Sequence, residues 1–148
     1  MQLSEHFTLA EMTVSETAAR QGLNNTPDAD STANLKRTCA MLEKVRALVG
    51  GPIVVTSGYR GPAVNAAVGG SKTSAHMTGR AADTNRPGLT PRQFAEKVKP
   101  KMKEFGIDQM ILEFDSWVHL GIARVGETPR CQILTINNST GGYVEGLC

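Results

Sequence analysis

The stretch that decides the fold reads Ser74-Ala75-His76-Met77-Thr78-Gly79-Arg80-Ala81-Ala82-Asp83. It places a histidine and an aspartate seven residues apart, with a glycine between them. Imidazole and carboxylate groups are both good zinc ligands, and glycine lets the backbone turn close to a metal ion. The small residues after Gly79 suit a short strand in a crowded place. The stretch therefore predicts a loop histidine and a strand carboxylate that converge on one ion.

A third ligand is available further along the chain. Residues 109–114 and 117–122 read as two antiparallel strands, and the second of them carries His119. Beside His76 and Asp83, His119 can complete a set of three protein ligands. Three protein ligands and a water molecule form the shell of a catalytic zinc ion, whereas a structural shell is usually closed by a fourth residue.

The remaining sequence pattern predicts an α+β fold. Apolar residues recur every three or four positions from Asp28 to Leu48, which predicts a long amphipathic helix. A second helix is predicted from Thr90 to Glu104, with a kink at Pro100. Residues 53–57 and 80–83 are predicted to be short strands. We expect a small antiparallel sheet that carries the zinc site and packs against the long helix, with additional short helices and a loosely structured C-terminal tail.

Length and composition describe one domain spanning residues 1–148, of which 40% are apolar and 20% charged. The net charge of +2 and the absence of a Lys/Arg stripe disfavour nucleic acid as a partner. No apolar run approaches the ~20 residues of a membrane span, and the N-terminus lacks the features of a signal peptide. We expect a monomer that is made in the cytoplasm. Cys39 is predicted to be a core residue, while Cys131 and Cys148 are interpreted as incidental thiols.

The motif Ser-x-His-x-x-Gly-x-Ala-x-Asp at residues 74–83, followed by Trp117-Val118-His119, resembles peptidase family M15. Within that family it is most similar to the small, single-domain zinc D-Ala-D-Ala carboxypeptidases and phage endolysins. Further agreement comes from Ser57-Gly58-Tyr59-Arg60, Asn65, Val68-Gly69-Gly70 and Asp108-Gln109-x-Ile111-x-Glu113. The resemblance implies that His76, Asp83 and His119 bind one Zn²⁺ per chain. It also implies that the substrates are peptidoglycan peptides containing D-residues.

The other site residues are assigned by weighing candidates. Many relatives carry the catalytic carboxylate three residues before the last zinc histidine, but that position is Ser116 here. Glu113 and Asp115 are the alternatives, and we favour Glu113 as the general base. Arg60 is predicted either to stabilise an oxyanion or to clamp a substrate carboxylate. Ser74 is predicted to bind substrate or to orient a neighbouring ligand, with a simple loop cap as the alternative.

The choice of Glu113 depends on the hairpin turn between the two strands. Residues on one face of an antiparallel pair must match in parity, so Glu113 can lie beside His119 only if the turn has an odd number of residues. The example we consider is a turn at residues 115–117, with Phe114 opposite Val118. A two-residue turn would put Glu113 opposite Val118 and aim it away from the ion.

The predicted function is a zinc peptidase that cleaves peptidoglycan cross-peptides, as a phage or prophage endolysin released to the cell wall by a holin. The alternative from another class is a non-catalytic virion or structural protein that retains the fold. A third possibility is a cytoplasmic dipeptidase that acts on D-Ala-D-Ala. An open fourth position at the ion, faced by Glu113 or Asp115, distinguishes an enzyme from a structural protein.

Overall fold

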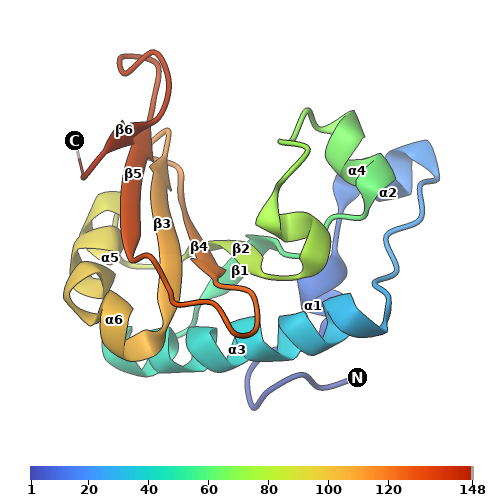
Figure 1. The fold of residues 1–148 in the computed structure, drawn as a ribbon, viewed down its shortest axis with the longest axis horizontal. Helices are drawn as coiled ribbons and strands as arrows, with labels where there is room; N and C mark the ends of the chain where they lie inside the picture. Colours follow the sequence, from blue (N-terminus) through green and yellow to red (C-terminus); the bar gives the residue numbers. More distant parts are fainter. Residues whose placement is uncertain (148) are drawn as a thin grey trace.

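The computed structural model describes residues 1–147 and has an α+β architecture built on one six-stranded sheet (Figure 1). Cys148, predicted to be an incidental thiol, lies outside the described residues. The strand order across the sheet is β1-β2-β4-β3-β5-β6. The strands are β1 (Val54–Ser57), β2 (Ala81–Asn85), β3 (Ile107–Glu113), β4 (Trp117–Ile122), β5 (Gln132–Ile136) and β6 (Val144–Glu145).

The helices surround this sheet unevenly. One long helix runs beneath the sheet in Figure 1, and the shorter helices gather at its two ends. None of the helices between residues 1 and 147 combines the length and the apolar character needed to cross a bilayer. The α-helices are α1 (Leu9–Thr13), α2 (Glu16–Gln21), α3 (Ala29–Val49), α4 (Pro62–Ala67), α5 (Pro91–Val98) and α6 (Met102–Phe105), and the 3₁₀ helices are η1 (Ala75–Thr78) and η2 (Lys99–Lys101).

The long helix α3 follows the predicted range to within one residue at each end. Asp28 caps its N-terminus, because a side-chain oxygen accepts a hydrogen bond from the backbone N–H of Ser31 at 2.7 Å. Gly50 ends the helix in the left-handed conformation, with φ of 67°. The apolar stripe is buried along most of the helix, with Leu35, Cys39 and Leu42 at 0% exposure, while Leu48 and Val49 at its end are partly buried. This confirms Cys39 as a core residue, and burial raises the pKa of its thiol to about 12.

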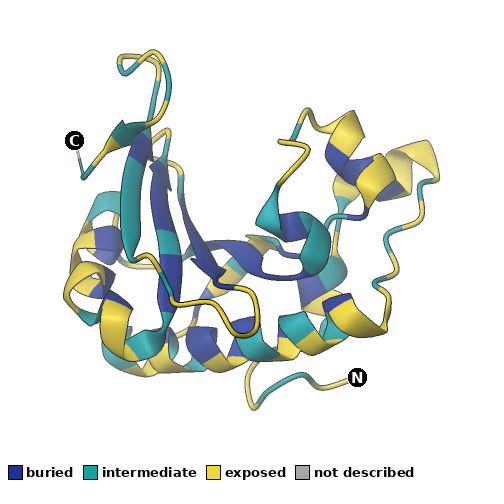
Figure 2. Ribbon diagram, viewed as in Figure 1, coloured by how far each residue is buried: buried dark blue, intermediate teal, exposed yellow. Residues whose placement is uncertain are grey.

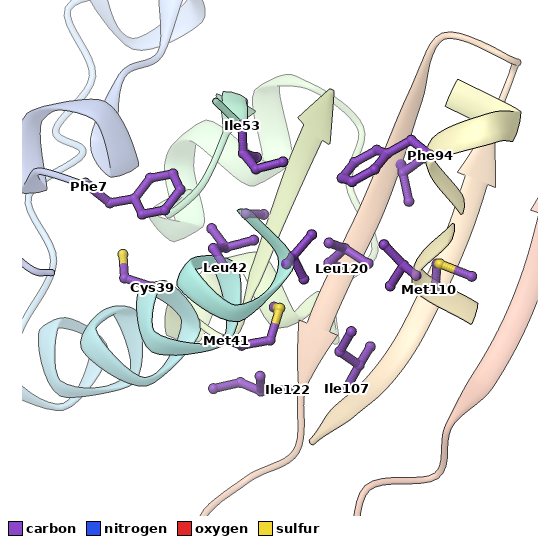
Figure 3. Packing of buried hydrophobic residues seen from close by; sticks show 14 of the residues in the cluster. Phe7, Cys39, Met41, Leu42, Ile53, Phe94, Ile107, Met110, Leu120 and Ile122 are labelled. Atoms are coloured by element: carbon purple, nitrogen blue, oxygen red, sulfur yellow. The ribbon is translucent and has the colours of Figure 1, made fainter. Parts of the chain in front are cut away.

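The hydrophobic core lies between α3, α5 and one face of the sheet (Figure 3). Alternate residues of the central strands point into it, and each fully buried valine, leucine or methionine side chain among them contributes about 1.5–3 kcal/mol. Figure 2 shows these buried positions along the central strands. The strand residues on the core side are Ala82, Met110, Leu112, Val118 and Leu120. The residues between them therefore point to the opposite face, where the site is built.

The prediction of an antiparallel sheet was wrong in part, because the sheet is mixed. Strand β5 pairs in parallel with β3, with Gln109 opposite Gln132 at one end of the ladder and Glu113 opposite Ile136 at the other. The predicted loosely structured tail therefore contains two strands. A parallel partner is joined by a long connection, so no turn signal next to Gln132 reveals the pairing. The predicted helix at residues 90–104 is interrupted at Pro100, which lies in η2 between α5 and α6.

Candidate metal centre and active site

His76 is oriented so that its Nε2 faces Asp83 and His119. It lies in η1, where its backbone N–H donates to the Ser74 hydroxyl at 3.2 Å. Its Nδ1 lies 2.7 Å from the carbonyl oxygen of Gly58 and donates to it, which leaves a free lone pair on Nε2. Position 58 requires glycine, because a Cβ there would collide with the carbonyl of Met12. The backbone of Gly58 thus acts as the support of a candidate metal ligand.

Strand pairing brings Asp83 and His119 together with this histidine. Asp83 in β2 is directly opposite His119 in β4, so both side chains lie on the same face of the sheet. Asp83 Oδ1 is 3.1 Å from His119 Nδ1 and 3.2 Å from His76 Nε2. The two ring nitrogens are 3.2 Å apart. All three residues are buried, with exposed fractions of 2% for His76, 8% for Asp83 and 7% for His119.

The geometry of this triangle fits a zinc ion. Metal–ligand distances of about 2.0 Å in a tetrahedral zinc shell correspond to ligand atoms about 3.3 Å apart. The three observed separations of 3.1–3.2 Å are therefore close to the edges of one tetrahedral face. Among residues 1–147 no further His, Cys, Asp or Glu side chain joins the group. Three protein ligands leave a position for water or substrate, as in catalytic zinc sites.

The ionisation of His76 and Asp83 also suits a cation. Burial lowers the pKa of His76, so the ring is neutral at pH 7. Burial alone would raise the pKa of Asp83, but the adjacent His76 and His119 hold it well below its usual range. Neutral imidazole and ionised carboxylate are the forms that bind metal ions. His76 and Asp83 therefore need to lose no proton at neutral pH before they can bind zinc.

Glu113 lies on the same face of the sheet, two positions along from the pair that contains His119. In the β3–β4 hairpin Ile111 is opposite His119, and Glu113 is opposite Trp117. Glu113 Oε2 accepts a hydrogen bond from Trp117 Nε1 at 2.9 Å. Burial and the negative charge of Asp83 raise the pKa of Glu113. A carboxylate with a raised pKa can exchange a proton nearer neutral pH than an exposed glutamate can.

The predicted register of this hairpin was wrong. The turn nevertheless has an odd number of residues, which is the condition for Glu113 to lie on the same face as His119. The turn is at residues 114–116, and Val118 is opposite Leu112 instead of Phe114. Phe114 and Asp115 both have positive φ, at 55° and 49°, which these residue types seldom adopt. A turn of this kind was therefore not expected at these positions. The partner of Val118 differs from the predicted one by two residues, an even number, so Glu113 stays on the same face of the sheet as His119.

The alternative carboxylate, Asp115, lies in the turn itself. Its side chain is 60% exposed, and its Oδ1 lies 3.6 Å from Arg92 Nη2. Asp115 is not part of the buried group formed by His76, Asp83 and His119. The geometry therefore favours Glu113 over Asp115 as the group that faces the metal centre.

Arg60 and Ser74 lie together next to His76. The backbone N–H of Arg60 donates to the carbonyl of His76 at 3.0 Å, and its Nη2 donates to the Ser74 hydroxyl at 3.2 Å. Within residues 1–147 the buried Nε of Arg60 has no hydrogen-bond partner. An unpaired buried donor is costly unless a ligand satisfies it. Ser74 caps η1, which is the simple cap role considered for it, and its hydroxyl also accepts a hydrogen bond from Arg60.

Two supporting residues were missed in the sequence analysis. Gly58 was quoted only as part of a family motif, and Trp117 only as a neighbour of His119. Neither role carries a sequence signal of its own, because each depends on which backbone or strand lies opposite.

In a comparison with protein-family models, the model described as peptidase M15 matches residues 5–121. The chain belongs to the peptidase M15 family. This confirms the resemblance that the motif at residues 74–83 indicated. M15 proteins are zinc peptidases, and the matched range contains His76, Asp83 and His119 together with Glu113. No curated protein matches the chain.

Proposed function

We propose that this M15 protein is a zinc-dependent peptidase that cleaves peptidoglycan stem peptides as a phage or prophage endolysin. The bond cut is of the D-Ala-D-Ala carboxypeptidase or the L-Ala-D-Glu endopeptidase type. The observation that carries the proposal is the buried His76–Asp83–His119 triangle, with Glu113 on the same face of the sheet. A purely structural zinc site would close its shell with a fourth residue and would need no such carboxylate.

Glu113 and Trp117 have separate roles in the hydrolysis of the peptide bond. Zinc, when bound, supplies a Lewis acid that polarises the substrate carbonyl and makes water acidic enough to attack it. Glu113 accepts the proton of the attacking water and then delivers it to the leaving amine. The indole N–H of Trp117 fixes one oxygen of Glu113, which leaves the other oxygen for proton transfer. The raised pKa of Glu113 helps it to act first as a base and then as an acid.

Arg60 provides the positive charge of the site. Ser74 holds its Nη2, while the buried Nε lacks a partner between residues 1 and 147. A guanidinium in this position can donate to the carbonyl oxygen as it becomes negative, or to a carboxylate of the substrate. Both roles give the peptide a defined orientation relative to Glu113.

Digestion of purified sacculi tests the proposal. The protein should release soluble peptides that mass spectrometry can identify, chelation should abolish the release, and added zinc should restore it. The fragment masses would identify the bond that is cut. A zinc-loaded protein that releases no peptide from sacculi would contradict the proposal and favour a structural role for the chain.

A further inference from the structure

We propose that Tyr143, with Ile136 beside it, forms a substrate-binding wall on the side of the site formed by β5 and the start of β6. The wall contacts the peptide two or three residues from the cleaved bond. This inference rests on the proposed peptidase function and deepens it, because it assigns a specificity-determining residue. Family membership does not supply that assignment, since the match ends at residue 121, whereas Ile136 ends β5 and Tyr143 immediately precedes β6.

The strand register places Tyr143 level with the proposed base. Ile136 of β5 is opposite Glu113 of β3 in the parallel ladder. In the antiparallel β5–β6 pair, Thr135 is opposite Val144. Continuing that pairing by one residue puts Tyr143 beside Ile136. Glu113, Ile136 and Tyr143 therefore follow one another across neighbouring strands.

The alternation of side chains puts this row on the face of the metal centre. Thr135 is 1% exposed and points to the buried side of the sheet, so the neighbouring Ile136 points to the other side. Residues that are directly opposite in a ladder share a face, so Tyr143 points the same way as Ile136 and Glu113. The side chain of Tyr143 is accessible, because 58% of this residue is exposed. Its ring is thus available to a ligand that lies along the row.

Electrostatics supports the same placement. The pKa of Tyr143 is raised by partial burial and by the negative charges of Glu113 and Asp83, while the positive charge of Arg60 lowers it. A phenol that senses all three charges must lie close to the site, although it is sixty residues away from Asp83 in the sequence. The register and the electrostatics are separate observations: the register places the backbone of Tyr143 two strands from Glu113, and the electrostatics indicates that its hydroxyl lies within reach of the charges of the site.

The spacing of the strands indicates which part of the substrate reaches this wall. Tyr143 lies two strand spacings from Glu113, which is about 10 Å at about 4.8 Å per strand. An extended peptide covers about 3.3–3.6 Å per residue, so this span holds about three residues. Arg60 follows β1, which is at the edge of the sheet opposite β6. Tyrosine suits the role, since its ring packs on apolar groups while its hydroxyl bonds to a peptide group.

The test compares two peptides that span the bond identified by sacculus digestion. The long peptide carries three residues on each side of the bond, and the short peptide carries only the two flanking residues with blocked ends. In the zinc-loaded protein, Tyr143→Ala should raise KM for the long peptide about tenfold and leave kcat within about twofold. Its kinetics with the short peptide should equal those of the unaltered protein. Tyr143→Phe should retain most of the affinity, because it keeps the ring.

Two controls separate binding from folding. Val125→Ala removes a side chain that is 77% exposed and follows β4 at the end opposite Trp117, so it should change neither peptide's kinetics. Thermal unfolding should show that the Tyr143 variants are as stable as the unaltered protein. Unchanged KM for the long peptide in Tyr143→Ala, or an equal loss for both peptides, would overturn this inference and leave the peptidase function standing. No cleavage of either peptide by the unaltered protein would overturn both.

Discussion

Replacing Glu113 with glutamine separates catalysis from folding in a single variant. Glutamine keeps the shape of the side chain and an oxygen that can accept the hydrogen bond now made by Trp117 Nε1 at 2.9 Å. It cannot accept a proton from water, and loss of a general base lowers a rate by about 10²–10⁴-fold. At the same time, burial disfavours the ionised carboxylate and raises its folded pKa. Above that pKa the charge therefore destabilises the fold, and Glu113→Gln should not lower the unfolding temperature at pH 7.

The assay measures kcat/KM on a soluble stem peptide, the zinc content and the unfolding temperature of the same preparations. Asp115→Asn is the matched control, because it removes a carboxylate two residues away whose side chain is 60% exposed. We expect Asp115→Asn to retain most activity and both variants to keep their metal. An active Glu113→Gln with an inactive Asp115→Asn would refute the assignment of the base to β3 and place it in the turn.

Three further predictions concern the charges of the molecule. Arg60→Ala should lower kcat/KM by about 10² or more while zinc content and folding stay normal, and an unchanged rate would show that the guanidinium does not reach the substrate. The acid limb of the pH profile of kcat/KM should lie above the ordinary glutamate range, since the pKa of Glu113 is raised and the ionised form is the base; this limb should disappear in the residual activity of Glu113→Gln. Asp108→Asn should cost about 1–3 kcal/mol at pH 7, because the carboxylate accepts hydrogen bonds from Arg130 Nη2 and the Arg130 backbone N–H, both at 2.8 Å. These bonds hold the pKa of Asp108 below its usual range despite its burial. The difference in unfolding free energy between the unaltered protein and Asp108→Asn should therefore shrink as the pH falls through that range. A difference that does not depend on pH would contradict this explanation.

The parts of the fold that sequence could predict depend on local patterns. The apolar stripe of α3, its Asp28 cap and its Gly50 end are all written within one contiguous segment. The metal triangle was predictable for a different reason. His76 and Asp83 are only seven residues apart in the sequence, so their side chains cannot lie far apart in the fold. The third ligand, His119, was one of only three histidines in the chain.

The parts that sequence could not predict depend on partners distant in the chain. Gln132 to Ile136 forms a strand because β3 offers a parallel edge, and its own residues do not identify that partner. The hairpin register was missed because Phe114 and Asp115 adopt positive φ where glycine or asparagine would be expected. Tyr143 could not be connected to the site without β5, since that strand is what brings it level with Glu113.

The zinc content of the purified protein tests the central claim most directly. The account predicts one zinc ion per chain after reconstitution and its loss in His119→Ala, with helical and strand content unchanged by circular dichroism. His6→Ala is the matched control, because His6 bonds to Glu43 at 2.6 Å, is not part of the triangle, and should leave zinc binding unchanged. Full zinc retention by a folded His119→Ala protein, or no zinc in the unaltered protein, would contradict the assignment of His76, Asp83 and His119 as the metal centre.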